Sequence, residues 1–160
     1  MIVKERGARA LEEAIARESD PLSSLVLDYT LNIRNLVQAF KIGKDAGEER
    51  LRQLRADDTD VFERVGTFQE RVDRDQYCDL LRGWAIDYNW DCRVRRISQQ
   101  PGYVFLEPTE FGEHAATSTM DEVCSLSIYE FDENDKIAHL DVYLQRRDKE
   151  GAPGSWSKAA

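Results

Sequence analysis

The chain has 160 residues, of which 41% are hydrophobic and 33% are charged, and its formal net charge is −9. This size and composition indicate one soluble globular domain, and no apolar run approaches the roughly 18 residues that a membrane-spanning helix needs. The negative charge argues against a nucleic-acid-binding protein, because such proteins present clustered Lys and Arg side chains to phosphates.

The N-terminus and the cysteines indicate the compartment. Residues 1–6 contain no apolar signal core, and Cys78, Cys92 and Cys124 have no CxxC spacing. Both features predict a cytoplasmic protein with reduced thiols, a disulfide or metal role being the alternative. With two histidines and no phosphate loop or dinucleotide fingerprint, the sequence predicts no metal site and no cofactor.

The first half of the chain has apolar residues at helical spacing in several segments. One of them begins at Asp20-Pro21, where a capping side chain followed by proline marks a helix start. Its many apolar residues make it the expected core helix, and Asp73 is the expected cap of the last helix. The four predicted helices cover residues 2–18, 21–42, 48–55 and 73–86.

The second half of the chain is rich in β-forming residues, separated by turns at Pro101-Gly102 and at residues 132–135. A run of helices followed by a run of strands indicates an α+β fold. We expect an antiparallel sheet that curls around the helices and leaves a cone-shaped cavity. The predicted strands cover residues 61–65, 90–97, 103–113, 118–131 and 136–146.

Three segments carry a resemblance to a known family. They read KDAGEE…ADD (44–58), VFERVG (61–66) and DKIAHLDVYL (135–144). In this order and spacing they resemble the NTF2-like superfamily, in its SnoaL-like and ketosteroid-isomerase-like branch. The resemblance implies a cystatin-like cone, with a curved antiparallel sheet around N-terminal helices.

The resemblance also implies a division of the chain into three parts. Residues 1–20 would be an extra N-terminal helical extension, and residues 21–148 would be the NTF2-like domain. Residues 149–160, rich in Gly, Ser and Pro, would be a disordered tail.

The ketosteroid isomerases supply one set of expected site residues. In those enzymes a carboxylate removes a proton beside a carbonyl, and two donors stabilise the resulting oxyanion. The resemblance places Glu63 at the base, Phe40 at the oxyanion tyrosine, without its hydroxyl, and Ser127 at the second donor. The epoxide hydrolase pattern of the superfamily has two acidic positions. The first falls on Glu110, which is an acid, and the second falls on Val142, which is not.

Strand alternation gives a second view of the cavity, because every other residue of a strand faces the same side. Combined with the resemblance, it predicts the substrate-binding residues Phe40, Leu106, Ser127, Tyr129, Val142 and Leu144. The predicted catalytic residues are Glu63, Glu110 and His114.

Each predicted catalytic residue has a structural alternative. Glu110 could instead be a solvated strand end, and His114 an exposed residue near the cavity mouth. Glu63 could be a general base whose pKa an apolar cavity raises. Otherwise, it would be the ion-pair partner of a neighbouring arginine, namely Arg64, Arg71 or Arg74.

Two functions remain open at this point. The first is a cofactor-independent lyase, isomerase, dehydratase or cyclase acting on a hydrophobic cyclic or aromatic molecule by general acid/base catalysis. The second is a non-catalytic ligand-binding or dimerisation module. Either is expected to form a homodimer through an apolar outer sheet face that contains Phe111, Ile137 and Tyr143. We expect no nucleic-acid or membrane partner.

Overall fold

The computed structural model describes residues 7–146. Its helices are α1 (Leu11–Arg17), α2 (Pro21–Ile42), α3 (Lys44–Arg55) and α4 (Arg74–Asp87). Its strands are β1 (Arg9–Ala10), β2 (Asp58–Val65), β3 (Arg71–Asp73), β4 (Tyr88–Gln100), β5 (Tyr103–His114), β6 (Met120–Phe131) and β7 (Ile137–Arg146).

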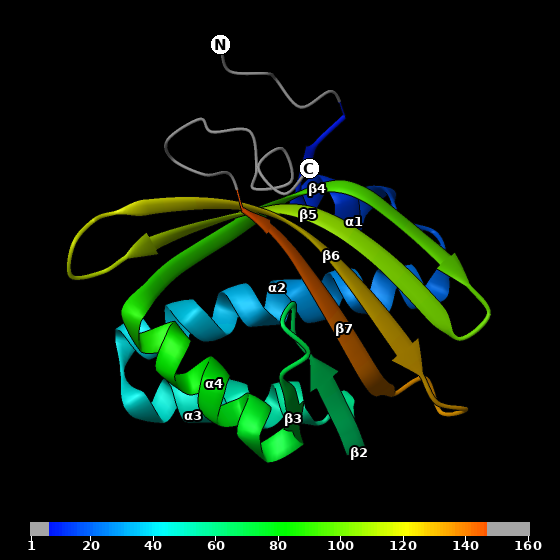
Figure 1. The fold of residues 1–160 in the computed structure, drawn as a ribbon, viewed down its shortest axis with the longest axis horizontal. Coiled ribbons are helices and arrows are strands. Elements are labelled where there is room, and N and C mark those ends of the chain that lie inside the picture. Colours follow the sequence, from blue (N-terminus) through cyan, green and yellow to red (C-terminus); the bar gives the residue numbers. More distant parts are fainter. Residues whose placement is uncertain (1–6, 147–160) are drawn as a thin grey trace, which may run out of the picture.

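The described strands form one sheet in the order β1-β4-β5-β6-β7-β2-β3, which arches over the helices (Figure 1). α2 lies under the concave face of the sheet, and α3 and α4 lie below α2 in the same view. The predicted α+β cone is therefore confirmed. The prediction of a purely antiparallel sheet is wrong, because β2 pairs with β7 in parallel.

α2 is the central core helix, as its apolar pattern predicts. Pro21 occupies the first turn, where its missing N–H costs no hydrogen bond. Asp20 precedes it but its side chain makes no capping hydrogen bond, contrary to expectation. The buried residues of α2 pack against the sheet and the other helices: Val26, Leu27, Tyr29, Leu36 and Val37.

α4 begins at the predicted cap. Asp73 Oδ1 accepts a hydrogen bond from the Gln76 backbone N–H at 2.9 Å, and Gln76 Oε1 accepts one from the Asp73 N–H at 2.9 Å. This reciprocal capping box satisfies two backbone donors that the helix itself cannot. It also fixes the junction between the short strand β3 and α4.

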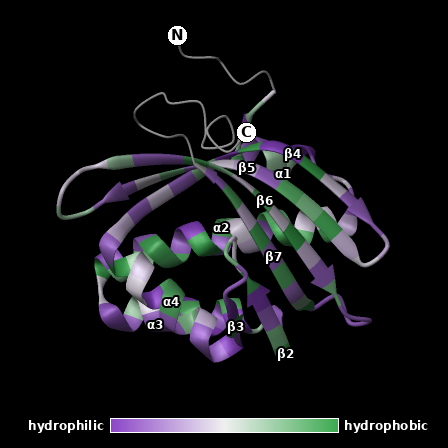
Figure 2. Cartoon of the chain, viewed as in Figure 1, coloured by the Kyte–Doolittle hydropathy of each residue, from purple (hydrophilic) through white to green (hydrophobic). Residues whose placement is uncertain are grey.

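The long strands are paired over most of their length. Tyr88 pairs with His114, and Gln100 pairs with Tyr103 at the other end of the β4–β5 hairpin. Between the two strands, Gly102 has φ 79°, the left-handed conformation that a glycine after a turn proline adopts without strain. Figure 2 shows hydrophobic and hydrophilic bands alternating along β5, β6 and β7.

The N-terminal segment is joined to the main body. β1 pairs with β4, and Leu11 of α1 is buried in the common core. The first helix was predicted over residues 2–18, and its described part is Leu11–Arg17. Residues 1–6 and the predicted disordered tail at 149–160 lie outside the described residues. In the described part of the chain, no helix is long and apolar enough to cross a bilayer.

The outer face of the sheet differs in one residue from the expected apolar patch. Ile137 is only 3% exposed, because the β6–β7 register shifts between Glu130 and Phe131 and Ile137 joins the core. Its place in an outer patch was predicted wrongly. Tyr143 remains on this face and is half exposed.

Candidate functional site

A cavity of about 450 Å³ lies between the concave face of the sheet and helices α2 and α4. Most of its wall is apolar and aromatic, which suits a small hydrophobic molecule. The residues that line it include Ile33, Tyr77, Leu81, Trp84, Tyr88, Trp90, Leu106, Pro108, Tyr129, Leu140, Val142 and Leu144. Its polar and charged lining residues are Thr30, Arg64, Glu110, Asp121, Ser125 and Ser127.

Glu110 lies on the cavity wall, on the inward side of β5. The Trp90 indole Nε1–H donates a hydrogen bond of 3.1 Å to Glu110 Oε1. Trp90 is held in turn by Trp84, whose ring stands at 70° to it with centroids 5.8 Å apart. Within the described part of the chain, Glu110 makes no ion pair and its Oε2 accepts no hydrogen bond. The structure thus places this acid where the strand pattern predicts it.

Glu63 lies outside the cavity, so its expected place on the wall is wrong. It is 40% exposed, and its Oε1 is 2.5 Å from Arg71 Nη1 and 3.7 Å from His139 Nδ1. The reason is the two-residue period of a strand. Phe62, next to it in β2, is 2% exposed and stacks on Tyr77, so Glu63 faces the opposite side. The alternative of an ion pair with Arg71 describes the observed contact.

Arg64 occupies the cavity wall instead of Glu63. It follows Phe62 by two residues and therefore shares its inward side. Its guanidinium Cζ lies 5.5 Å from the centroid of the Tyr77 ring. From the sequence, Arg64 was expected only as an ion-pair partner of Glu63. The signal that could have found it is the large apolar Phe62, which marks the buried face of the strand.

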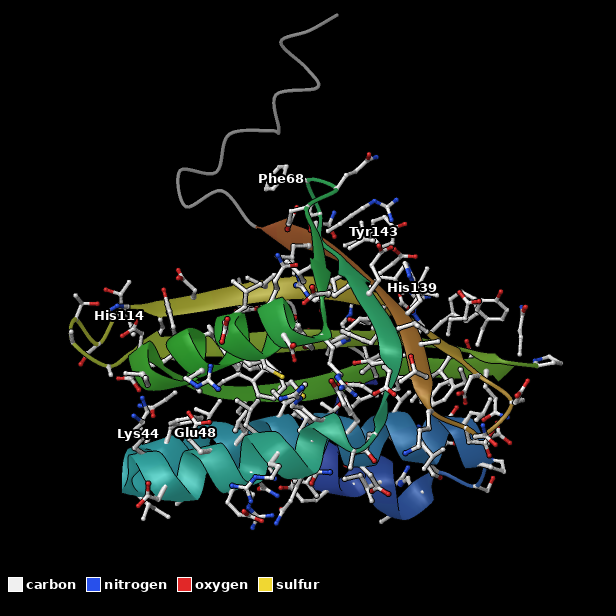
Figure 3. All side chains as sticks on the ribbon, turned by 90° about the horizontal axis from the view of Figure 1, so that it is seen from below. Lys44, Glu48, Phe68, His114, His139 and Tyr143 are labelled. Atoms are coloured by element: carbon white, nitrogen blue, oxygen red, sulfur yellow. The ribbon has the colours of Figure 1, made fainter. Side chains whose placement is uncertain are left out.

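Phe40 and His114 also lie outside the cavity. Phe40 packs against Gly47 where α2 meets α3, so close that a Cβ at Gly47 would overlap its ring. His114 stands edge-on to Tyr88 with centroids 5.0 Å apart, and its Nδ1 accepts a hydrogen bond from the Ala116 N–H. Figure 3 shows His114 at the end of the molecule opposite His139. The prediction that Phe40 and His114 belong to the cavity site is therefore wrong.

The other predicted contact residues surround the cavity. The structure places these five on its wall: Leu106, Ser127, Tyr129, Val142 and Leu144. That they bind a substrate stays a prediction. Trp84, on the inward side of α4, is a wall residue that the sequence analysis missed, since its helical spacing equally fits a core residue.

A second acid, Asp58, is buried in the core. Burial raises the pKa of Asp58 to about 7, the charge of Asp57 adds to the rise, and the charge of Arg74 opposes it. Its Oδ1 has no hydrogen-bond partner in the described structure, nor has the Tyr29 hydroxyl. The Tyr29 hydroxyl is still close enough to lower the pKa of Asp58 slightly.

Asp58 shares the core with three buried tyrosines, Tyr29, Tyr77 and Tyr129. Burial raises the pKa of Tyr77 to about 12, and it also raises the pKa values of Tyr29 and Tyr129. All three hydroxyls therefore stay protonated at neutral pH and can donate hydrogen bonds. The charge of Arg64 lowers the pKa of Tyr77, whereas the charges of Asp58 and Glu110 raise it.

Several solved structures have a fold similar to that of this chain. A proposed SnoaL-like polyketide cyclase from Shewanella putrefaciens CN-32 aligns with a TM-score of 0.64 at 9% identity, over 90% of each chain. An NTF2-like protein of unknown function from Cytophaga hutchinsonii ATCC 33406 aligns with a TM-score of 0.54 at 12% identity, over 81% of this chain and 94% of that one. This chain has the NTF2-like fold.

A further solved structure with a similar fold carries the name of an enzyme. An LEH-like epoxide hydrolase from M. tuberculosis aligns with a TM-score of 0.53 at 16% identity, over 69% of this chain and 83% of that chain. No protein-family model and no curated protein matches the sequence. At these identities the NTF2-like fold is what the comparisons establish, and the activity has to be argued from the site.

The cavity lining contains groups that suit acid/base chemistry. Among residues 7–146, no group of three or more His, Cys, Asp and Glu side chains is placed to hold a metal ion. Burial raises the pKa of the Cys92 thiol to about 12, which keeps it protonated and unreactive as a nucleophile. Glu110 and the hydroxyl groups on the cavity wall can take part in proton transfer and hydrogen bonding.

Proposed function

We propose that this protein is a cofactor-independent enzyme of the lyase, isomerase, dehydratase or cyclase type. Its substrate is a small cyclic or aromatic molecule bound in the cavity, and Glu110 is the general acid/base. The observation that carries the proposal is the Glu110 carboxylate, which lies in an apolar wall without an ion pair in residues 7–146. The proposal also draws on the NTF2-like fold, whose members include an epoxide hydrolase and a proposed cyclase.

The surroundings of Glu110 suit a base. The Trp90 indole holds Oε1 and sets the orientation of the carboxylate, so Oε2 is free to accept a proton from a bound molecule. Removal of a proton beside a carbonyl places negative charge on the carbonyl oxygen, which hydrogen-bond donors in the cavity then stabilise. The hydroxyls of Ser127, Tyr77 and Tyr129 are the donors on the cavity wall for this role.

A second candidate function is ligand binding without chemistry. It is favoured by the position of Glu63, because the acid that the resemblance makes the base is paired with Arg71 outside the cavity. It is also favoured by Phe40, which supplies no hydroxyl and lies away from the cavity. The two functions share the ligand site and differ in whether Glu110 moves a proton.

An exchange experiment separates the two functions. The probe is 2-tetralone, a cyclic aromatic ketone with acidic C–H bonds beside its carbonyl, whose uptake of deuterium from D₂O is followed by NMR. We expect the protein to accelerate exchange and Glu110→Gln to lower that acceleration by about 100-fold or more, as loss of a general base does. Binding of 2-tetralone without accelerated exchange would instead favour the binding module.

Two further variants make the test specific. Glu113→Gln is the matched control, because Glu113 follows Glu110 by three residues in β5 and lies on the outward side of the strand, so exchange should be unaffected. Glu63→Gln tests the role implied by the resemblance. If Glu63→Gln abolishes exchange and Glu110→Gln does not, the proposed role of Glu110 is wrong.

A further inference from the structure

The cavity contains a positive charge that the proposed proton transfer does not use. Arg64 is the one Lys or Arg among the residues lining this cavity within the described chain. Its position is set by β2, where Arg64 pairs with Val72 of β3 and with Leu140 of β7. The Tyr77 ring supports the guanidinium from one side, which limits its movement.

Arg64 forms no ion pair within residues 7–146, although several acids lie close to it in sequence. Asp60 pairs with Arg74 at 2.9 Å, and Glu63 pairs with Arg71 at 2.5 Å. Each of these acids is engaged by another arginine outside the cavity wall. Within residues 7–146, the guanidinium of Arg64 therefore has N–H donors that are available to a bound partner.

Glu110 is not that partner, because the two residues lie at opposite ends of the cavity. Arg64 pairs with Leu140 of β7. Glu110 pairs with Val123 of β6, which pairs in turn with Arg146 of β7. Leu140 and Arg146 are six residues apart, which corresponds to roughly 20 Å of extended strand. The cavity thus has a cationic end and an acidic end, with an apolar wall between them.

We propose that Arg64 is an anion subsite and that the ligand of the cavity is a small aromatic or cyclic carboxylic acid. The planar guanidinium presents paired N–H donors that match the two oxygens of a carboxylate, and the partly buried site strengthens the contact. The ring system of the ligand lies along the apolar wall toward Glu110. This inference rests on the proposed ligand-binding function of the cavity, but it does not depend on proton transfer by Glu110.

Two probes of the same shape test the subsite. They are 2-naphthoate and its neutral counterpart 2-naphthalenemethanol, with dissociation constants measured by calorimetry. The wild-type protein should bind 2-naphthoate at least about tenfold more tightly than 2-naphthalenemethanol. Arg64→Gln should weaken 2-naphthoate binding by roughly 10- to 100-fold and leave 2-naphthalenemethanol within about twofold.

Control variants show whether the effect belongs to Arg64. Arg71→Gln removes an arginine from the neighbouring strand that pairs with Glu63 outside the cavity, and should leave both dissociation constants unchanged. Arg64→Lys keeps the positive charge but loses the paired N–H donors of the guanidinium, and should retain part of the preference for 2-naphthoate. It also serves as the test variant if Arg64→Gln has a lower melting temperature than the wild type.

The outcomes separate this inference from the proposed function. Equal binding of the two probes by the wild type, or equal weakening of both in Arg64→Gln, would overturn the anion subsite while leaving a ligand cavity in place. Binding of neither probe would overturn the anion subsite and count against ligand binding in the cavity. Loss of exchange in Glu110→Gln with an intact preference for 2-naphthoate would support both proposals.

Discussion

At the start of β2, Asp58 lies in the core with 6% of its surface exposed. The charged form of a carboxyl is poorly solvated there, so the folded protein holds the proton up to a pKa of about 7, against an ordinary value of 3.8. Between these two pH values the folded state binds more protons than the unfolded state. Stability therefore falls as pH rises through this window, and the loss is complete above a pH of about 7.

Substitution of Asp58 by Asn tests this linkage, because an amide has no charge to bury. Relative to wild type, Asp58→Asn should gain stability as pH rises from about 4 to about 8, by about 2–4 kcal/mol in total. Urea unfolding at the two pH values measures the gain. Glu113→Gln should show no such gain. A wild-type stability that rises with pH over this window, unchanged in its slope by Asp58→Asn, would refute the interpretation.

In β2, the residue on the cavity wall is Arg64 and not its neighbour Glu63, and this one-residue difference limits how much of the site could be predicted. Strand alternation in β5, β6 and β7, combined with the family resemblance, places Glu110, Ser127 and Val142 on the cavity wall, where the structure has them. In β2 the resemblance aligns Glu63 with a catalytic base, whereas the burial of Phe62 turns Arg64 inward. Phe62 marks the buried face of β2, but its neighbour Val61 is also apolar and is exposed in the structure, so alternation alone leaves two possible faces.

Among the elements, the helices and long strands follow from local signals. Pro21 and the Asp73 capping box mark real helix starts, and Pro101-Gly102 marks a real hairpin turn. β3 was not predicted, because three residues carry no periodicity. The parallel pairing of β2 with β7 was missed for another reason, since it joins segments that are distant in sequence. The position of Phe40 likewise depends on the packing of α2 against α3.

Gly47 and Gly83 form a matched pair that tests this packing. A Cβ at Gly47 would overlap the Phe40 ring, whereas a Cβ at Gly83 in α4 would meet nothing within 4 Å. Gly47→Ala should lower the free energy of unfolding by about 1–3 kcal/mol. Gly83→Ala should raise it by about 0.5–1 kcal/mol, because alanine loses less backbone entropy on folding.

Chemical denaturation of both variants, followed by circular dichroism, measures these changes. If Gly47→Ala is as stable as Gly83→Ala, Phe40 does not pack as described. Phe40 would then be free to approach the cavity, as the sequence analysis expects.

For the whole molecule, the outer face of the sheet is the surface on which an assembly would form. Its central strands bring apolar side chains together, since Phe105 pairs with Ile128 and Leu126 with Tyr143. Tyr143 is half exposed, and Figure 3 shows it on β7 beside the β2–β3 hairpin. A second copy of the chain covering this face would remove the apolar surface from water.

Sedimentation at micromolar concentration tests this expected dimer. The wild type should sediment as a dimer and Leu126→Asp as a monomer, because a charge in the middle of the face would lose its solvation on association. Ile42→Asp is the control, since Ile42 is exposed at the end of α2 and is not part of the sheet. A wild-type monomer, or an unchanged dimer in Leu126→Asp, would contradict the expectation.

The cavity as a ligand site is the central claim, and an NMR titration tests it most directly. The indole N–H signals of Trp84 and Trp90 report on the wall, because the two rings contact each other and Trp90 donates to Glu110. On addition of 2-naphthoate, both signals should shift and saturate together with the backbone signals of Leu106 and Tyr129. If these signals stay in place, or only outer-face residues such as Leu126 and Tyr143 respond, the cavity is not the binding site.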